Sequence, residues 1–138
     1  MAVGWGVLFS KSFEMEARPQ ALLDGVRDFN SGHYFEAHEH WEDALEELPD
    51  HQWDLFIGLI QIAVGYHKLG QNLLGGAAGM LEKGLEKMKE ISPEGLPVEI
   101  EPLRKRVASD IESLRSEKFD FASWKQSPPR LRIPRERR

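Results

Sequence analysis

Apolar residues recur at helical spacing along most of the chain. Leu22, Val26 and Phe29 follow one another at i, i+4 and i+7, so one apolar stripe runs down a first helix. Residues 53–69 are apolar on nearly every side, which is typical of a helix at the centre of a domain. The body of the chain has no convincing run of strand alternation. The predicted helices span 19–30, 33–48, 53–69, 73–91 and a stretch that begins near Pro102.

Individual residues indicate how these helices begin and pack. Asn72 precedes the fourth helix and has a side chain suited to a helix N-cap. Pro102 suits the first turn of the last helix. Gly58 and Gly65 lie two turns apart in the third helix, where they would let a neighbouring backbone approach. We therefore expect close helix packing along this glycine stripe.

The chain also aligns with itself. The second and fourth helices superimpose at an offset of 40 residues, and the first and third at an offset of 38. The aligned pairs are Ala37 with Ala77, Trp41 with Leu81, Leu45 with Leu85, Leu48 with Met88, Leu22 with Ile60, Val26 with Val64 and Gly32 with Gly70. Hairpins of this kind bury their apolar faces by stacking. The sequence therefore predicts an all-α fold of two stacked helix-turn-helix hairpins, a tetratricopeptide-like pseudo-repeat, with a C-terminal capping helix.

Composition sets the domain organisation. A chain of 138 residues fits one domain, and we divide it into an irregular N-terminal arm (1–16), a helical domain (17–124) and a basic tail rich in Pro and Arg (125–138). Cysteine is absent, which excludes disulfides and thiolate metal sites and leaves His, Asp and Glu as the strong metal ligands. No apolar run reaches the ~20 residues that span a bilayer. We expect a soluble, cytoplasmic protein that does not bind membranes.

Charge is distributed unevenly along the chain. The net charge is −5, but residues 125–138 carry six basic residues against Glu136, so the tail is +5 and the rest is −10. An acidic body argues against nucleic acid as a partner. In the tail, basic and apolar residues alternate through Arg130-Leu131-Arg132-Ile133. This pattern predicts an extended segment whose apolar residues pack onto the acidic body. The alternative is a disordered basic tail.

The densest polar cluster lies in the second helix. On a helical wheel, Glu36, Glu39, His40 and Asp43 share the outer face. Carboxylates at i and i+3 with a histidine at i+4 could hold a divalent cation. Acidic helix faces are usually just solvated, however, and we prefer this interpretation of the outer face.

A second polar group is expected on the inner side of that helix. If the second and third helices are antiparallel neighbours, Tyr34, His38 and Glu42 meet Gln61 and His67. Two imidazoles and a carboxylate would suffice for a metal ion or a general acid/base pair. The same groups could instead satisfy one another in an interhelical hydrogen-bond network. The metal-ligand candidates are His38, Glu42 and His67.

Two stretches of the chain resemble a known family. Residues 29–39 (FNSGHYFEAHE), followed by residues 58–67 (GLIQIAVGYH), are similar to the prokaryotic family known as domain of unknown function 309. The resemblance covers about residues 20–90 and implies an all-α domain, but no reaction. The positions that match the family's polar residues are Glu36, His38, Glu39, Glu42, Gln61 and His67.

Two classes of function fit these observations. The first is a non-enzymatic module that binds a protein or a small ligand at the polar cluster (Tyr34, His38, Glu39, Glu42, Gln61, His67). The second is a metal-dependent, hydrolase-like enzyme in which a divalent ion on His38, Glu42 and His67 polarises a substrate or activates water. No other cofactor is expected. We also expect a homodimer contact, because the chain has more aromatic residues near its ends than the core needs: Trp5, Phe9, Phe13, Phe119, Phe121 and Trp124.

Overall fold

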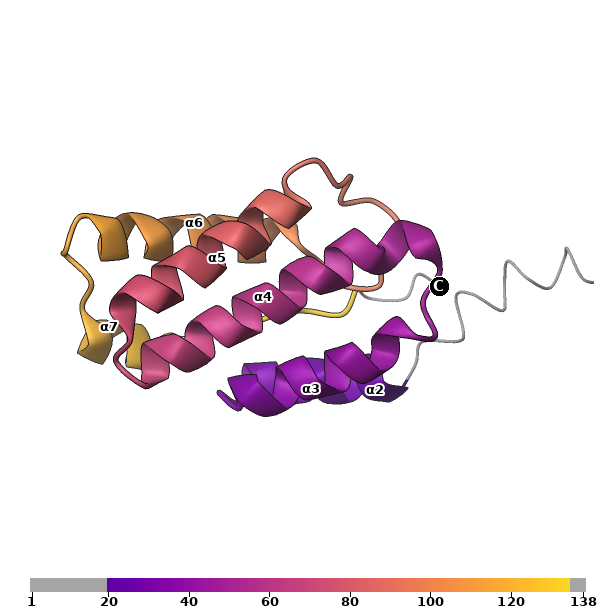
Figure 1. The fold of residues 1–138 in the computed structure, drawn as a ribbon, viewed down its shortest axis with the longest axis horizontal. Coiled ribbons are helices and arrows are strands. Elements are labelled where there is room, and N and C mark those ends of the chain that lie inside the picture. The colour runs from indigo at the N-terminus through magenta and orange to yellow at the C-terminus, as the bar shows by residue number, and fades with distance from the viewer. Residues whose placement is uncertain (1–19, 135–138) are drawn as a thin grey trace, which may run out of the picture.

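The computed structural model describes residues 20–134, and these fold as helices and connecting segments (Figure 1). The all-α prediction is confirmed for this part of the chain. The predicted N-terminal arm lies outside the described residues. No helix within residues 20–134 is both long and apolar enough to cross a bilayer. The helices are α2 (Gln20–Asn30), α3 (Tyr34–Leu45), the short 3-10 helix η1 (Asp50–Gln52), α4 (Trp53–Gly70), α5 (Leu74–Met88), α6 (Glu101–Arg115) and α7 (Phe121–Gln126).

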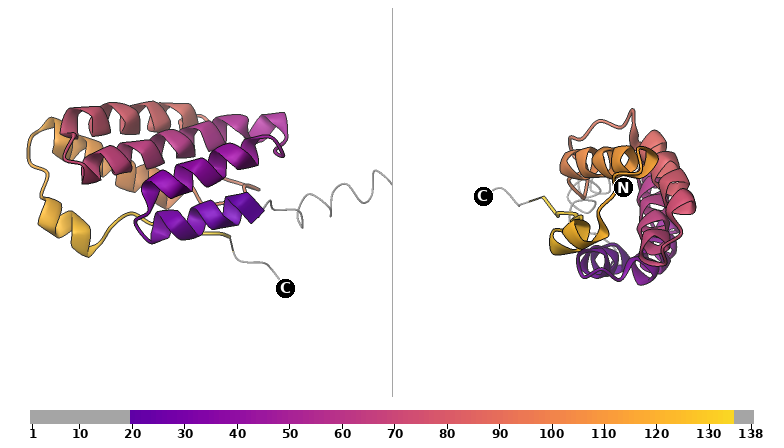
Figure 2. Two further views of the ribbon diagram at one scale, coloured as in Figure 1. Left: turned by 60° about the horizontal axis from the view of Figure 1, so that its bottom comes forward. Right: turned by 90° about the vertical axis from the view of Figure 1, so that its left-hand side faces the viewer.

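Two antiparallel hairpins, α2–α3 and α4–α5, form most of the domain. Viewed end-on, the helices follow one another around an arc from α2 to α6 (Figure 2). As predicted, α4 is central and has buried residues along its whole length. Its glycines allow close packing on α5, because a Cβ added at Gly58 would lie 3.1 Å from the Gly84 carbonyl oxygen.

The two hairpin turns have the same backbone structure. Gly32 and Asn72 both adopt left-handed backbone conformations, with φ of 83° and 63°. In each turn the next N–H donates to the carbonyl five residues back, at Asp28 in the first turn and Lys68 in the second. This arrangement terminates a helix and satisfies its last carbonyls. The prediction that Asn72 caps α5 is wrong: it ends α4, and Leu73 occupies the N-cap position of α5.

A single offset of 40 residues relates the two hairpins. A Cβ added at Gly25 would lie 2.2 Å from Trp41, and one added at Gly65 would lie 2.9 Å from Leu81, so the same helix-to-helix contact recurs 40 residues later. The predicted offset of 38 for the first and third helices is wrong. Because α4 is apolar on nearly every side, shifting the alignment of α2 with α4 by two residues still pairs apolar residues with apolar residues. Only the turns and the glycines fix the register of this alignment.

Beyond the predicted capping helix α6, the chain forms a short helix that was not predicted. α7 begins after Asp120, whose carboxylate accepts a hydrogen bond from the Ser123 N–H. Its sequence is only six residues long, too short to show a helical period. Two predicted helices extended too far towards their C-termini: α3 stops at Leu45 and α5 at Met88.

The C-terminal segment returns to α2 and packs against the core. Leu131 is 1% exposed, and its backbone N–H and C=O both bond to the Asn30 carboxamide. Glu99 donates its N–H to the Arg132 carbonyl in an isolated antiparallel bridge. The predicted docking of the tail is therefore confirmed as far as residue 134. Arg130 and Arg132 are exposed and make no ion pair with any carboxylate of residues 20–134.

Candidate functional site

Tyr34 belongs to the aromatic core. It is 7% exposed, and its ring packs edge-on against Phe29 at 5.1 Å and obliquely against Tyr66 at 5.5 Å. Burial raises the pKa of Tyr34 to about 12, because a phenolate would be poorly solvated there. The side chain therefore acts in packing, and no hydrogen bond links it to His38.

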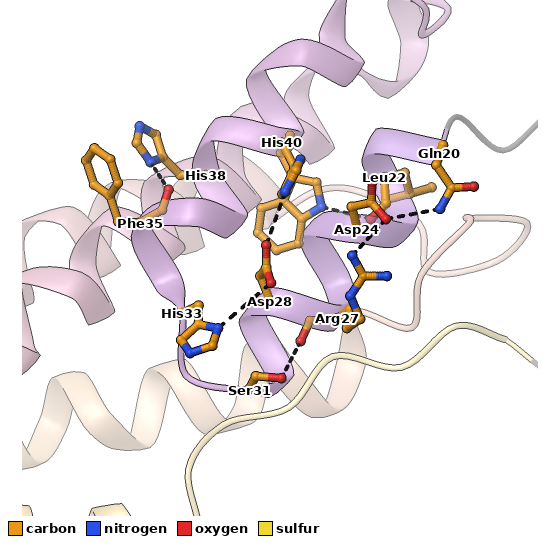
Figure 3. Close-up of polar contacts among 11 residues, drawn as sticks. Gln20, Leu22, Asp24, Arg27, Asp28, Ser31, His33, Phe35, His38 and His40 are labelled. Carbon is orange, nitrogen blue, oxygen red and sulfur yellow. Dashed lines mark hydrogen bonds and ion pairs between the residues drawn. The ribbon is translucent and has the colours of Figure 1, made fainter.

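His38 has a defined orientation on the surface of α3 (Figure 3). Its Nδ1 lies 2.6 Å from the Phe35 carbonyl oxygen. Since a carbonyl can only accept, Nδ1 donates here, and in the neutral imidazole the lone pair is on Nε2. Nε2 lies 3.9 Å from Oε1 of Glu42, whose side chain is 56% exposed. Among the members of the predicted polar cluster, this is the one side-chain ion pair or hydrogen bond that forms within residues 20–134.

Phe35 connects the two predicted imidazoles. Its ring centroid is 4.8 Å from that of His38 and 5.2 Å from that of His67, so both histidines contact one exposed aromatic ring. No group of three or more His, Asp or Glu side chains in residues 20–134 is arranged to hold a metal ion. The structure therefore does not assemble His38, Glu42 and His67 as a ligand set.

Gln61 does not join the predicted network. Its Oε1 is buried and has no hydrogen-bond partner in the described part of the chain. We expected Tyr34, His38 or Glu42 to satisfy it, and this expectation is wrong. Gln61 and His67 are six residues apart on one helix, which places them about 120° apart around its axis. Since His67 faces Phe35 on α3, Gln61 is turned away from that contact.

The outer face of α3 contains fewer groups than predicted. Glu36, Glu39 and Asp43 are exposed there. His40 does not share this face, because its Nε2 lies 3.2 Å from Oδ2 of Asp28 on α2 (Figure 3). The candidate cation set is therefore incomplete, and His40 instead links α2 to α3.

A buried carboxylate that sequence reasoning missed joins α4, α6 and α7. Asp110 is 6% exposed and accepts hydrogen bonds from the Tyr66 hydroxyl at 2.7 Å and the Trp124 indole N–H at 3.3 Å. Arg106 Nε lies 3.2 Å from the same carboxylate and compensates its charge. Burial, with Asp110 alongside, raises the pKa of Tyr66 well above its usual range. A signal was present in the sequence, because Asp110 lies three residues after Val107 on the apolar stripe of α6.

Most of the exposed large hydrophobic side chains lie at one end of the bundle. We call Phe35, Leu73, Leu74 and Phe121 the turn-end surface; their exposed fractions run from 41% to 51%. They come from the start of α3, the α4–α5 turn and α7, which meet at the same end in Figure 1. The fifth such residue, Trp53, begins α4 at the opposite end. Of these residues, sequence reasoning singled out only Phe121 as an aromatic residue beyond the needs of the core, because a helical period alone does not show which apolar residues stay exposed.

Most of the two hairpins lies in the part of the chain that is similar to a known family. Residues 22–80 match the family Domain of unknown function (DUF309). The resemblance predicted from the sequence is thereby confirmed. The DUF309 match includes Phe35, His38 and His67 but ends within α5, so Asp110 lies beyond it. No curated protein matches the chain.

Proposed function

We propose that the chain is a non-enzymatic helical interaction domain, and that a partner protein binds its turn-end surface. One observation carries the proposal: four of the five large exposed hydrophobic side chains of residues 20–134 lie at this end. Burying such side chains contributes roughly 25 cal/mol per Å² of apolar surface. Exposed apolar groups gathered in one region are typical of protein-binding surfaces.

The backbone that carries Leu73 and Leu74 supports this role. Asn72 fixes the turn in the left-handed conformation, and the Leu73 N–H donates to the Lys68 carbonyl at 3.0 Å. The Leu73 carbonyl in turn accepts from the Ala77 N–H at 2.9 Å. A rigid presentation lowers the entropy lost on binding, so more of the apolar contact appears as affinity.

Charge near Phe35 indicates the chemistry of the partner. Glu36, Glu39 and Asp43 are exposed on the same helix and make no ion pair with a basic residue of the described chain. Acidic groups beside an apolar anchor favour a partner segment in which apolar side chains alternate with Lys or Arg. We infer that such a segment crosses the start of α3 and the α4–α5 turn.

Site-specific photo-cross-linking tests the proposal. A photoreactive residue placed at Leu73 should capture one defined partner in the producing cells, whereas the same residue at Trp53, similarly exposed at the other end, should not. The captured protein is then purified and titrated against the domain. Phe35→Ser and Leu74→Ser should each weaken binding about tenfold or more, since exposed aromatic and aliphatic anchors dominate interfaces. Trp53→Ser should leave the affinity unchanged.

Two outcomes would contradict the proposal. One is equal capture from positions 73 and 53, which would indicate nonspecific apolar contact. The other is a reconstituted affinity that Phe35→Ser and Leu74→Ser leave unaltered while circular dichroism shows a native fold.

Metal-dependent chemistry at His38 is the second candidate. It is favoured by the hydrogen bond from Nδ1 to the Phe35 carbonyl, because metal-binding histidines commonly donate one ring N–H and ligate through the other nitrogen. A cation held by His38 and Glu42 would complete its coordination with water, and could then act on a substrate by polarising it. Isothermal titration with Zn²⁺ alone tests this candidate. Binding that His38→Ala abolishes and His33→Ala retains would support it, and the absence of binding would exclude it.

A further inference from the structure

The segment after α7 lies on the domain as a bound peptide would. The Asn30 carboxamide accepts from the Leu131 N–H at 2.7 Å and donates to the Leu131 carbonyl at 2.8 Å. One residue later, the Arg132 carbonyl accepts from the Glu99 N–H at 2.9 Å. These hydrogen bonds are made to the main chain, so they hold an extended segment whatever its side chains are.

Side chains of the segment alternate between buried and exposed. In the consecutive residues 129–132, Pro129 and Leu131 are buried, and Arg130 and Arg132 are exposed. Leu131 joins the same core cluster as Val98 and the other buried residues of the domain. The site therefore selects an apolar residue at one central position and leaves the side chains on either side of it exposed.

We propose that this site, formed by α2 and residues 98–100, is a recognition groove for an extended segment of a partner protein. In the structure the chain's own residues 128–133 fill it. The segment that fits carries a leucine or similar aliphatic residue between two basic residues, like Arg130-Leu131-Arg132. The groove is distinct from the turn-end surface, and the inference does not depend on the function proposed for that surface.

The way the tail is attached supports exchange with a partner. Ser127, Arg130 and Arg132 are exposed, so the segment is fixed by the buried Pro129 and Leu131 and by the partly buried Ile133, which packs against the core. A segment with few buried contacts can open locally while the core stays folded. While attached, the tail competes at the high effective concentration of an intramolecular ligand, so it acts as an autoinhibitory occupant. A basic segment also complements the acidic body, whose net charge without residues 125–138 is −10.

A peptide titration on the full chain tests the groove. Leu131→Asp places a charge in the apolar site and should release the tail. A fluorescent peptide with the sequence of residues 127–134 should then bind this variant, as measured by anisotropy, and bind the wild-type chain at least ~10-fold more weakly because the tail competes. A peptide with Asp in place of the leucine should not bind.

Control variants separate the groove from general charge attraction. Adding Asn30→Ala to Leu131→Asp should weaken peptide binding by about tenfold or more, since it removes the two hydrogen bonds from the Asn30 carboxamide to the main chain of the segment. Adding Gln20→Ala, an exposed change at the other end of the same helix, should leave binding unchanged. A folded Leu131→Asp chain that does not bind the peptide would overturn the proposal, as would binding that Asn30→Ala does not affect.

Hydrogen exchange on the wild-type chain keeps the proposal testable if Leu131→Asp does not fold. The amides of Leu131 and Glu99 should exchange through local opening, well before those of Leu59 in α4. Exchange of all three only on global unfolding would show that the tail is a permanent part of the core, and would overturn the proposal. A wild-type dimer that Asn30→Ala separates would assign the groove to the tail of a second copy, and would also overturn it.

Discussion

The indole of Trp41 occupies the space that a side chain at Gly25 would fill. Its Nε1 donates to the Leu22 carbonyl at 3.2 Å, which fixes the ring against α2. A Cβ at Gly25 would lie 2.2 Å from that nitrogen, well inside van der Waals contact. The packing of Trp41 against α2 thus requires a residue without a Cβ at position 25.

Gly25→Ala should therefore destabilise the domain, by roughly 2 to 4 kcal/mol, because the buried indole cannot move without losing its hydrogen bond and its packing. Gly79→Ala is the matched control. No atom lies within 4 Å of its added Cβ, and alanine favours the helix, so the free energy of unfolding should rise by about 0.5 to 1 kcal/mol. Urea denaturation measures both. Equal effects of the two substitutions would contradict the packing argument.

Substitutions at the left-handed positions of the two turns should affect stability differently. Gly32→Ala places a Cβ at φ 83° and should cost about 1 kcal/mol. Asn72→Gly relieves the same conformation at φ 63° and should be neutral or slightly stabilising. Thermal unfolding followed by circular dichroism measures both changes. A loss of stability in Asn72→Gly would mean that the asparagine side chain makes a contact beyond its backbone conformation.

Removal of the Asp110 carboxylate should destabilise the packing of α6 and α7 on α4. Asp110→Leu leaves the Tyr66 hydroxyl and the Trp124 N–H without their partner, and it leaves Arg106 uncompensated. Because Arg106 is partly solvated, we expect a loss of about 2 to 3 kcal/mol, less than for a fully buried ion pair. Denaturant titration followed by tryptophan fluorescence measures this loss.

Glu112→Leu is the matched control for the Asp110 variant. It replaces a carboxylate with the same apolar side chain on the same helix, but at an exposed position. Its effect on the free energy of unfolding should stay within about 0.5 kcal/mol. If Asp110→Leu were as stable as this control, the buried carboxylate would have no role in holding the three helices together.

Alkaline pH should unfold the domain through its tyrosines. The chain has two, Tyr34 and Tyr66, and both are buried. Burial raises the pKa of Tyr34 to about 12 and that of Tyr66 well above its usual range, whereas an unfolded tyrosine ionises near pH 10. Above pH 10 the unfolded state thus loses protons that the folded state retains, so stability falls as the pH rises towards 12.

Ultraviolet absorbance of the phenolate measures this effect. We expect one steep rise that coincides with the loss of the helical circular dichroism signal. A gradual rise centred near pH 10 in a protein that stays folded would contradict the burial of both rings.

The helices and the docking of the tail could be predicted because each follows from a local period. The 3.6-residue pattern located α2 to α6, and the alternation around Leu131 indicated an extended, half-buried segment. The pairing partners could not be predicted in this way. Nothing local shows that Asn30, at the end of α2, satisfies the backbone of Leu131 far along the chain.

The candidate site was harder to predict than the fold, because its geometry depends on how helices rotate against one another. His38 and His67 do approach a common neighbour, Phe35, as antiparallel helices would suggest. Gln61 does not, since its position on α4 turns it away. The Asp110 cluster draws on three helices, one of them too short to recognise from sequence.

The contact between Asn30 and Leu131 also sets the order in which the molecule is assembled. The two residues are 101 positions apart, whereas the hairpin turns close over a handful of residues. Closing a long loop costs more chain entropy than closing a short one, so the hairpins should form first and the arc should close last. During synthesis, the Asn30 side chain at the end of α2 can therefore form its hydrogen bonds only after Leu131 has been made. Asn30→Ala should then speed unfolding and leave the folding rate nearly unchanged.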